Sequence, residues 1–208
     1  MTLARRHFLA LALAGAVPAC TSAEPAYFTL AAVPGTARRG GPALVELRRP
    51  GLAGYLDRPE IVRSNSAYSL RLTGSERWGE PLGDLFVRIL AEDLNSRLPG
   101  TNVFTSAGSI TAEAGSTIEM DIQRFDADPT GQVVLLAQVA VSRGRARVSA
   151  ATRVVRLTVQ PASARTADLV AAMSTALGQL ADTLATMLRD TTPESRDATP
   201  APRNKKRR

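Results

Sequence analysis

The side chains best able to do chemistry in this chain are two pairs of carboxylates. Glu119 and Asp121 lie two residues apart in an alternating apolar segment, so a strand would place both on one face. Asp57 and Glu60 stand three residues apart in a short charged segment. Paired carboxylates can hydrolyse a glycosidic bond without a histidine. The same spacings also arise on a half-exposed strand and in a turn with a local ion pair, and we expect these structural roles here.

The only histidine, His7, and the only cysteine, Cys20, both lie near the N-terminus of the 208-residue chain. The rest of the chain therefore cannot supply a zinc site of Cys and His, a Ser-His-Asp triad, a Cys-His nucleophile or a haem ligand of either type. A single cysteine also excludes an internal disulfide. Glycine-rich phosphate-binding loops of either standard spacing are missing from the sequence. We expect no catalytic residue, no metal site and no cofactor.

The first twenty residues have the order of a bacterial export signal. Two arginines without an acid precede an apolar run at 8–17, and small residues follow. A helix of this run is too short for a hydrocarbon core of about 30 Å. Residues 17–20 resemble a lipobox, in which the cysteine is acylated and begins the mature chain. The sequence thus predicts a signal peptide over 1–19 and lipidation of Cys20. Cleavage at another small residue is the alternative, and the arginine pair leaves Sec or twin-arginine export open.

The positive charge of the chain is concentrated at its two ends. The formal net charge is +7, and residues 191–208 hold six basic residues against two acids. The segment between signal and tail is therefore nearly neutral, which does not indicate a nucleic-acid groove. Three prolines in residues 191–208 favour a disordered basic tail, and weak attraction to anionic lipid headgroups is the functional alternative. We expect no nucleic-acid partner.

The pattern of apolar residues between the ends predicts an α+β fold. Apolar residues recur at helical spacing over 82–98 and 166–189. Strand patterns occur at 27–31, 43–47, 67–72, 118–123, 133–141 and 155–159. We predict two long helices packed on a mostly antiparallel or mixed β-sheet. The predicted organisation is a tether at 20–26, a single domain at 27–190 and the tail at 191–208.

Several runs of the chain resemble one family. They are Tyr27–Leu30 shortly after Cys20, Tyr55–Val62, Arg77–Leu82 before the first helix, and Ile122–Phe125 before an apolar strand. Their order resembles the PqiC family, the auxiliary outer-membrane lipoproteins of ABC-type and MCE-type lipid transport systems. The likeness extends over nearly the whole mature chain. Gly54, where the family often has proline, and the basic tail depart from its pattern.

The resemblance implies a non-catalytic outer-membrane lipoprotein that faces the periplasm and docks an MCE-domain transporter subunit. Its acyl chains would hold it in the outer membrane, and Thr21 and Ser22 after the cysteine also resemble lipoproteins sorted there. Self-association into a homo-oligomer stays open. We place the partner contact on Tyr55, Leu56, Asp57, Arg58 and Pro59, because connecting segments with aromatic and arginine side chains are favoured as interface anchors.

Two other functions stay open from the sequence. The first is a periplasmic lipoprotein that carries a lipid in its own cavity between sheet and helices, and a large apolar cavity would favour it. The second is a periplasmic hydrolase, which a cleft with two facing carboxylates would favour.

Overall fold

The computed structural model describes residues 24–106, 112–144 and 148–191 of the chain. The predicted signal peptide, Cys20 and all but the first residue of the predicted tail lie outside these residues. The strands are β1 (Ala26–Phe28), β2 (Leu44–Leu47), β3 (Gly51–Leu52), β4 (Glu60–Ser66), β5 (Ser69–Trp78), β6 (Asn102–Thr105), β7 (Ser116–Ala127), β8 (Val133–Arg143) and β9 (Val148–Val159). The helices are α1 (Leu82–Arg97) and α2 (Thr166–Asp190).

All nine of these strands form one mixed sheet, built around β7. Along one edge of β7 the short strands β2, β3 and β4 pair with it in parallel, one after another. Along the other edge β7, β8 and β9 form an antiparallel meander. The turn between β7 and β8 is held by Asp128, whose Oδ1 accepts from the backbone N–H groups of Thr130 and Gln132. The direct partners of β7 are therefore antiparallel on one side and parallel on the other, and beyond them β4 pairs with β5 antiparallel.

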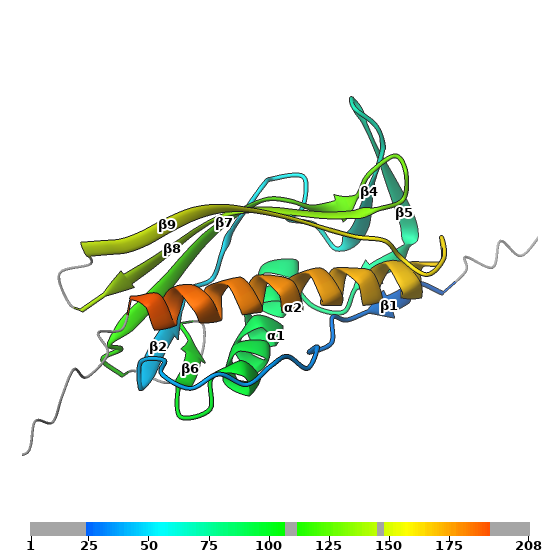
Figure 1. Ribbon diagram of the computed structural model, residues 1–208. Coiled ribbons are helices and arrows are strands. Elements are labelled where there is room, and N and C mark those ends of the chain that lie inside the picture. The colour runs from blue at the N-terminus through cyan, green and yellow to red at the C-terminus, as the bar shows by residue number, and fades with distance from the viewer. Residues whose placement is uncertain (1–23, 107–111, 145–147, 192–208) are drawn as a thin grey trace, which may run out of the picture.

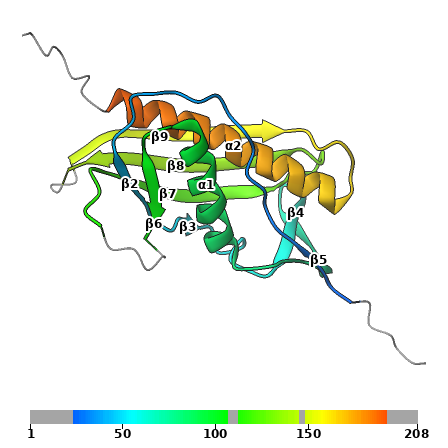
Figure 2. The ribbon, with the colours of Figure 1, turned by 90° about the horizontal axis from the view of Figure 1, so that it is seen from below.

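Both helices lie on the same face of the sheet, as Figures 1 and 2 show. Helix α2 lies along β8 and β9, and α1 packs against α2 and β6. In α1, Phe86 meets Phe125 of β7 edge to face, with ring centroids 5.4 Å apart. The apolar stripes of both helices are buried in one hydrophobic core between helices and sheet. Burial of these stripes is what fixes the helices on the sheet.

An extended segment, residues 29–43, runs beneath the helices between β1 and β2, and we call it the strap (Figures 1 and 2). It covers Arg97 of α1, which is only 2% exposed. Arg97 donates through Nη1 to the carbonyl of Val33 at 2.9 Å, and through Nε to Asp182 of α2 at 2.7 Å. Asp93, one turn earlier in α1, accepts from the Val33 N–H at 2.8 Å and from Arg97 at 3.3 Å. One guanidinium thus joins the strap to both helices.

Two glycines make room for this guanidinium. A Cβ on Gly35 of the strap would lie 2.4 Å from Arg97 Cζ, and one on Gly178 of α2 would lie 3.2 Å from Arg97 Nη2. The space around Arg97 is therefore filled without a side chain at either position. Burial of Asp93 raises the pKa of its carboxyl, against the lowering effect of its bonds from Val33 and Arg97.

Many predicted elements are confirmed. Helices are predicted at 82–98 and 166–189 and found at Leu82–Arg97 and Thr166–Asp190, and the sheet is mixed. The helices differ in length: α1 has 16 residues and α2 has 25. The last three predicted strands all fall within the meander, and β8 is its central strand. Strand β8 is buried on both faces at Val133–Leu135 and again at Val141 and Ser142, whereas Gln138 between them is exposed.

Other strands differ from the prediction. The sequence pattern indicates none of the short strands β3, β4 and β6, and β4 occupies the end of the segment expected to connect strands. The strand predicted at 67–72 starts at Ser69 and continues to Trp78. Its apolar row of Tyr68, Leu70 and Leu72 is exposed rather than packed in the core. Alternation predicts that these side chains share a face, but not whether another layer covers that face.

The Arg97 network gives a prediction about stability. We expect Arg97→Met to lower the free energy of unfolding by about 3–5 kcal/mol, because it leaves the carboxylate of Asp93 buried without its cation. The double variant Asp93→Asn with Arg97→Met should recover part of this loss, since the buried charge is then removed. Urea unfolding of each variant measures the effect.

Arg88→Met is the matched control for this experiment. Arg88 lies on the exposed side of α1 and pairs with Glu80 at the surface. Its replacement should change the free energy of unfolding by less than about 0.5 kcal/mol. Equal effects of the two single substitutions would contradict a special role for the buried network.

Candidate functional site

Three of the runs that carry the family resemblance meet in space at the end of β5. Phe28 of β1 pairs in parallel with Trp78 of β5. The backbone N–H of Trp78 donates to the carbonyl of Pro59 at 2.7 Å, and that of Gly79 donates to the carbonyl of Phe28 at 2.9 Å. Trp78 itself is 5% exposed and belongs to the hydrophobic core. Segments from 27–30, 55–62 and 77–82 therefore form one local structure.

Two of the five residues predicted to contact a partner point into the fold. Leu56 is 1% exposed and lies in the hydrophobic core. Tyr55 is partly buried against that core, and its hydroxyl donates to Asp126 Oδ2 of β7 at 3.3 Å. Leu56 and Tyr55 thus fix the turn to the sheet. Of the other three residues, Asp57 and Pro59 are exposed and Arg58 is partly buried.

The hydroxyl of Tyr55 belongs to a polar cluster around Asp126, which is only 1% exposed. Asp126 also accepts from Ser64 of β4 at 2.8 Å and from Arg124 Nη2 at 2.8 Å. Burial, followed by the charge of Asp126, raises the pKa of Tyr55 from 10.0 to about 12. Both factors disfavour the phenolate, so Tyr55 stays a neutral donor at physiological pH.

The remaining three residues, Asp57, Arg58 and Pro59, line a surface depression of about 360 Å³, which we call the docking depression. Its other walls come from the start of α1 and the residues just before it: Trp78, Glu80, Pro81 and Leu82. Arg58 Nε is one of two buried side-chain polar atoms without a hydrogen-bond partner in the described residues. The docking depression therefore combines apolar side chains, two carboxylates and an arginine whose Nε has no partner among the described residues.

Local ion pairs in this region differ from those expected. Among the described residues, the side chain of Arg58 forms no ion pair, so no local pair with Asp57 stabilises the turn. Glu60 instead pairs with Arg77 of β5 at 3.9 Å. Arg88 of α1 pairs with Glu80, which precedes the helix. The sequence, with Asp57 next to Arg58 and Glu60 two residues on, does not indicate that Arg58 forms no ion pair among the described residues.

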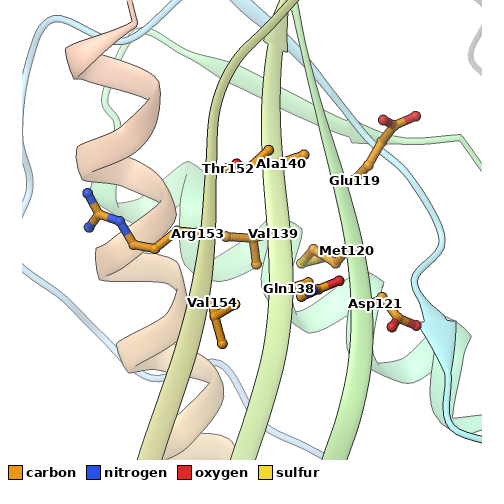
Figure 3. Close-up of a pocket in the computed structure, with 9 residues that line it drawn as sticks. All are labelled: Glu119, Met120, Asp121, Gln138, Val139, Ala140, Thr152, Arg153 and Val154. Atoms are coloured by element: carbon orange, nitrogen blue, oxygen red, sulfur yellow. The ribbon is translucent and has the colours of Figure 1, made fainter.

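The other carboxylate pair lies on the face of the sheet opposite the helices. Glu119 and Asp121 line a shallow depression of about 650 Å³ across β7, β8 and β9, together with Gln138, Ala140, Thr152 and Val154 (Figure 3). Glu119 pairs with Arg48 at 2.7 Å. The pair thus shares one face, as its spacing predicts, and the ion pair of Glu119 is the interaction expected of a half-exposed strand.

The chain is similar to one known protein family. The family model for ABC-type transport auxiliary lipoprotein components matches residues 28–185. The match runs from the end of β1 into α2, and it contains the docking depression and the Asp126 cluster. No curated protein matches the chain.

Solved structures share the fold at low sequence identity. A crystal structure of a protein from Xanthomonas campestris is 18% identical, with a TM-score of 0.66, over 79% of this chain and 94% of that one. A crystal structure of an uncharacterised protein is 16% identical, with a TM-score of 0.65, over 79% of this chain and 98% of that one. At these identities the likeness shows the fold alone.

The Asp126 cluster gives a prediction about pH. The ultraviolet titration curves of the wild type and of Tyr55→Phe should differ by one phenolate transition, near pH 12. Because the pKa of Tyr55 in the folded protein lies above the ordinary tyrosine value of 10.0, the contribution of Tyr55 to stability is complete below pH 10 and is lost as the pH rises toward 12. Below pH 10, Tyr55→Phe should cost about 1 kcal/mol of unfolding free energy. A difference transition centred at pH 10 would contradict the bond to Asp126.

Proposed function

The chain belongs to the family of ABC-type transport auxiliary lipoprotein components, and we propose that it is the non-catalytic docking component of an MCE- and ABC-type lipid transport system. In this proposal Cys20 carries acyl chains that hold the domain at the periplasmic face of the outer membrane. The family match over residues 28–185 is the observation that carries the proposal. Neither helix in the described part of the chain is long and apolar enough to cross a bilayer.

The proposed mechanism is positional. The lipid anchor keeps the domain at the inner leaflet of the outer membrane, while the docking depression holds the end of an envelope-spanning MCE-domain subunit. The partner carries the lipid, and ATP hydrolysis belongs to other subunits of the transporter. Residues Asp57, Arg58 and Pro59 make the contact, and Tyr55 and Leu56 position them from behind.

The charge of Arg58 supports the docking depression as the contact. A guanidinium with a buried, unsatisfied Nε is costly in the free protein, and an acceptor supplied by a partner would remove that cost. Arginine beside aromatic and proline side chains is also typical of residues that dominate binding energy at interfaces. We therefore propose an acidic or carbonyl group of the MCE-domain subunit as the group that Arg58 binds.

The interior of the domain favours docking over carriage of a lipid in its own cavity. The side chains of the hydrophobic core occupy the space between helices and sheet. The depressions at Glu119 and at Arg58 lie outside that space, on the surface. A carried lipid would need an apolar cavity that buries most of its surface.

Reversal of the charge at Arg58 tests the docking contact. We expect Arg58→Glu to keep the melting temperature of the domain and to lower recovery of the MCE-domain subunit about tenfold or more in a pull-down after mild crosslinking in cells. Arg156→Glu, the same charge change on the exposed side of β9, should leave recovery unchanged. Unchanged recovery with Arg58→Glu would exclude the contact, and a collapsed melting temperature would assign Arg58 to the fold.

Replacement of Cys20 tests the anchor. Several acyl chains on one residue give stable residence in a membrane, because each buried methylene contributes about 0.8 kcal/mol. Cys20→Ala should therefore leave the domain folded but move it from the outer-membrane fraction to the soluble fraction. Mass spectrometry of the wild-type chain is the direct check, and an unmodified Cys20 would overturn the proposal of an anchor.

A further inference from the structure

The exposed apolar side chains of the domain are concentrated at one end. Five large hydrophobic residues are exposed in the described part of the chain: Tyr27 (65%), Tyr68 (99%), Leu70 (47%), Leu72 (44%) and Val154 (62%). The first four lie on β1, on β5 and at the β4–β5 turn. Figure 1 shows the β4–β5 hairpin projecting away from the body of the sheet, with β1 at the same end of the molecule. A cluster of exposed apolar side chains is typical of a surface that contacts a protein, a membrane or a ligand.

The pairing of β4 with β5 separates the hairpin into two different faces. Val62 lies opposite Leu72 and Ser64 lies opposite Leu70, so both leucines share one face. Tyr68 lies at the turn, where its backbone N–H donates to Ser66 Oγ at 3.3 Å, and Ser66 Oγ is 2.9 Å from Ser69 Oγ. These bonds fix the turn in a conformation that presents Tyr68 to the outside.

The other face of the hairpin carries two arginines. Arg63 and Arg71 lie opposite each other, and residues 61–75 contain no acidic residue. Arg63 holds the base of the hairpin to the start of α2, where its Nη2 donates to Thr166 Oγ1 at 2.6 Å. Arg71 has no ion pair within the described residues. It lines a depression of about 440 Å³ with Arg63, Arg165 and Glu76, and Glu76 pairs with Arg63 at 3.7 Å. The projecting tip thus carries apolar side chains beside an unpaired positive charge.

We propose that the hairpin tip, formed by Tyr68, Leu70 and Leu72, inserts into the interfacial layer of the bilayer that holds the lipid anchor. Tyrosine favours the boundary between water and hydrocarbon, and Arg71 can contact anionic headgroups while its stem stays near the apolar layer. The serines and Asn65 around the turn suit the headgroup region, so insertion is shallow.

The position of the anchor relative to the hairpin supports a bilayer as the occupant. This step depends on the proposed acylation of Cys20. Cys20 precedes Ala26, the first residue of β1, by six residues, and such a chain reaches at most about 20 Å. Ala26 pairs with Glu76 at the base of β5, and the tip lies eight residues further, about 26 Å at strand spacing. An inclined hairpin therefore reaches the same bilayer as the anchor.

Tryptophan substitution tests this contact in the acylated full chain. Tyr68→Trp and Val154→Trp are matched reporters, because both replace exposed apolar side chains, and Val154 lies on β9 away from the hairpin. The proteins are placed in vesicles of phosphatidylethanolamine and phosphatidylglycerol with brominated acyl chains, which quench only tryptophan in the bilayer. We expect Tyr68→Trp to be quenched several-fold more than Val154→Trp. Equal quenching of the two would overturn the proposal.

A second measurement separates the hairpin from the anchor. Cys20→Ala protein is sedimented with the same vesicles, with and without Leu70→Ser and Leu72→Ser together. The double serine variant should bind about tenfold more weakly, whereas Val154→Ser should bind as before. Equal binding by all three would overturn the hairpin contact even if the wild-type Cys20 is acylated. Loss of quenching at Tyr68→Trp together with crosslinks from that position to a protein would assign the tip to a protein partner instead.

Discussion

The buried guanidinium of Arg97 is the interaction on which the arrangement of helices and strap depends. A charge at this depth is tolerated only where hydrogen bonds satisfy it, and here α1, α2 and the strap each supply an acceptor. The strap begins after β1 and ends before β2, which lie at opposite ends of the molecule (Figure 1). By holding the middle of the strap against the helices, Arg97 limits where both strands can join the sheet.

The elements that local periodicity specifies could be predicted from the sequence. The stripes of α1 and α2 and the alternation in β7 repeat over enough residues to identify each element and its buried side. The parallel strands β2, β3 and β4 are short, and their pairing with β7 joins segments far apart in the chain. No local signal reports such pairing. Asp93 and Arg97 have the spacing of a surface ion pair, and the strap and α2 together make the pair a buried one.

The sequence indicates where the candidate site lies, but not which of its residues are buried and which are at the surface. The segment 55–59 was predicted as one contact surface, whereas its residues divide between the core and the docking depression. In a turn there is no fixed period from which to read which side chain points inward. Tyr55 is directed by its bond to Asp126 of β7, and Leu56 by burial in the core. Arg58 stands out only because the described residues place no acceptor beside its Nε.

The two proposed surfaces are connected by one strand, and this has a consequence for transport. Leu70 and Leu72 lie near the start of β5, and Trp78, a wall of the docking depression, ends it. A hairpin inserted in the bilayer would therefore hold the docking depression within about 26 Å of the leaflet. A lipid that leaves a partner at that position has at most this distance to cross. Each methylene kept out of water lowers the free energy of the lipid by about 0.8 kcal/mol. In the proposed arrangement, the anchor, hairpin and docking depression together shorten the aqueous gap that a transported lipid must cross.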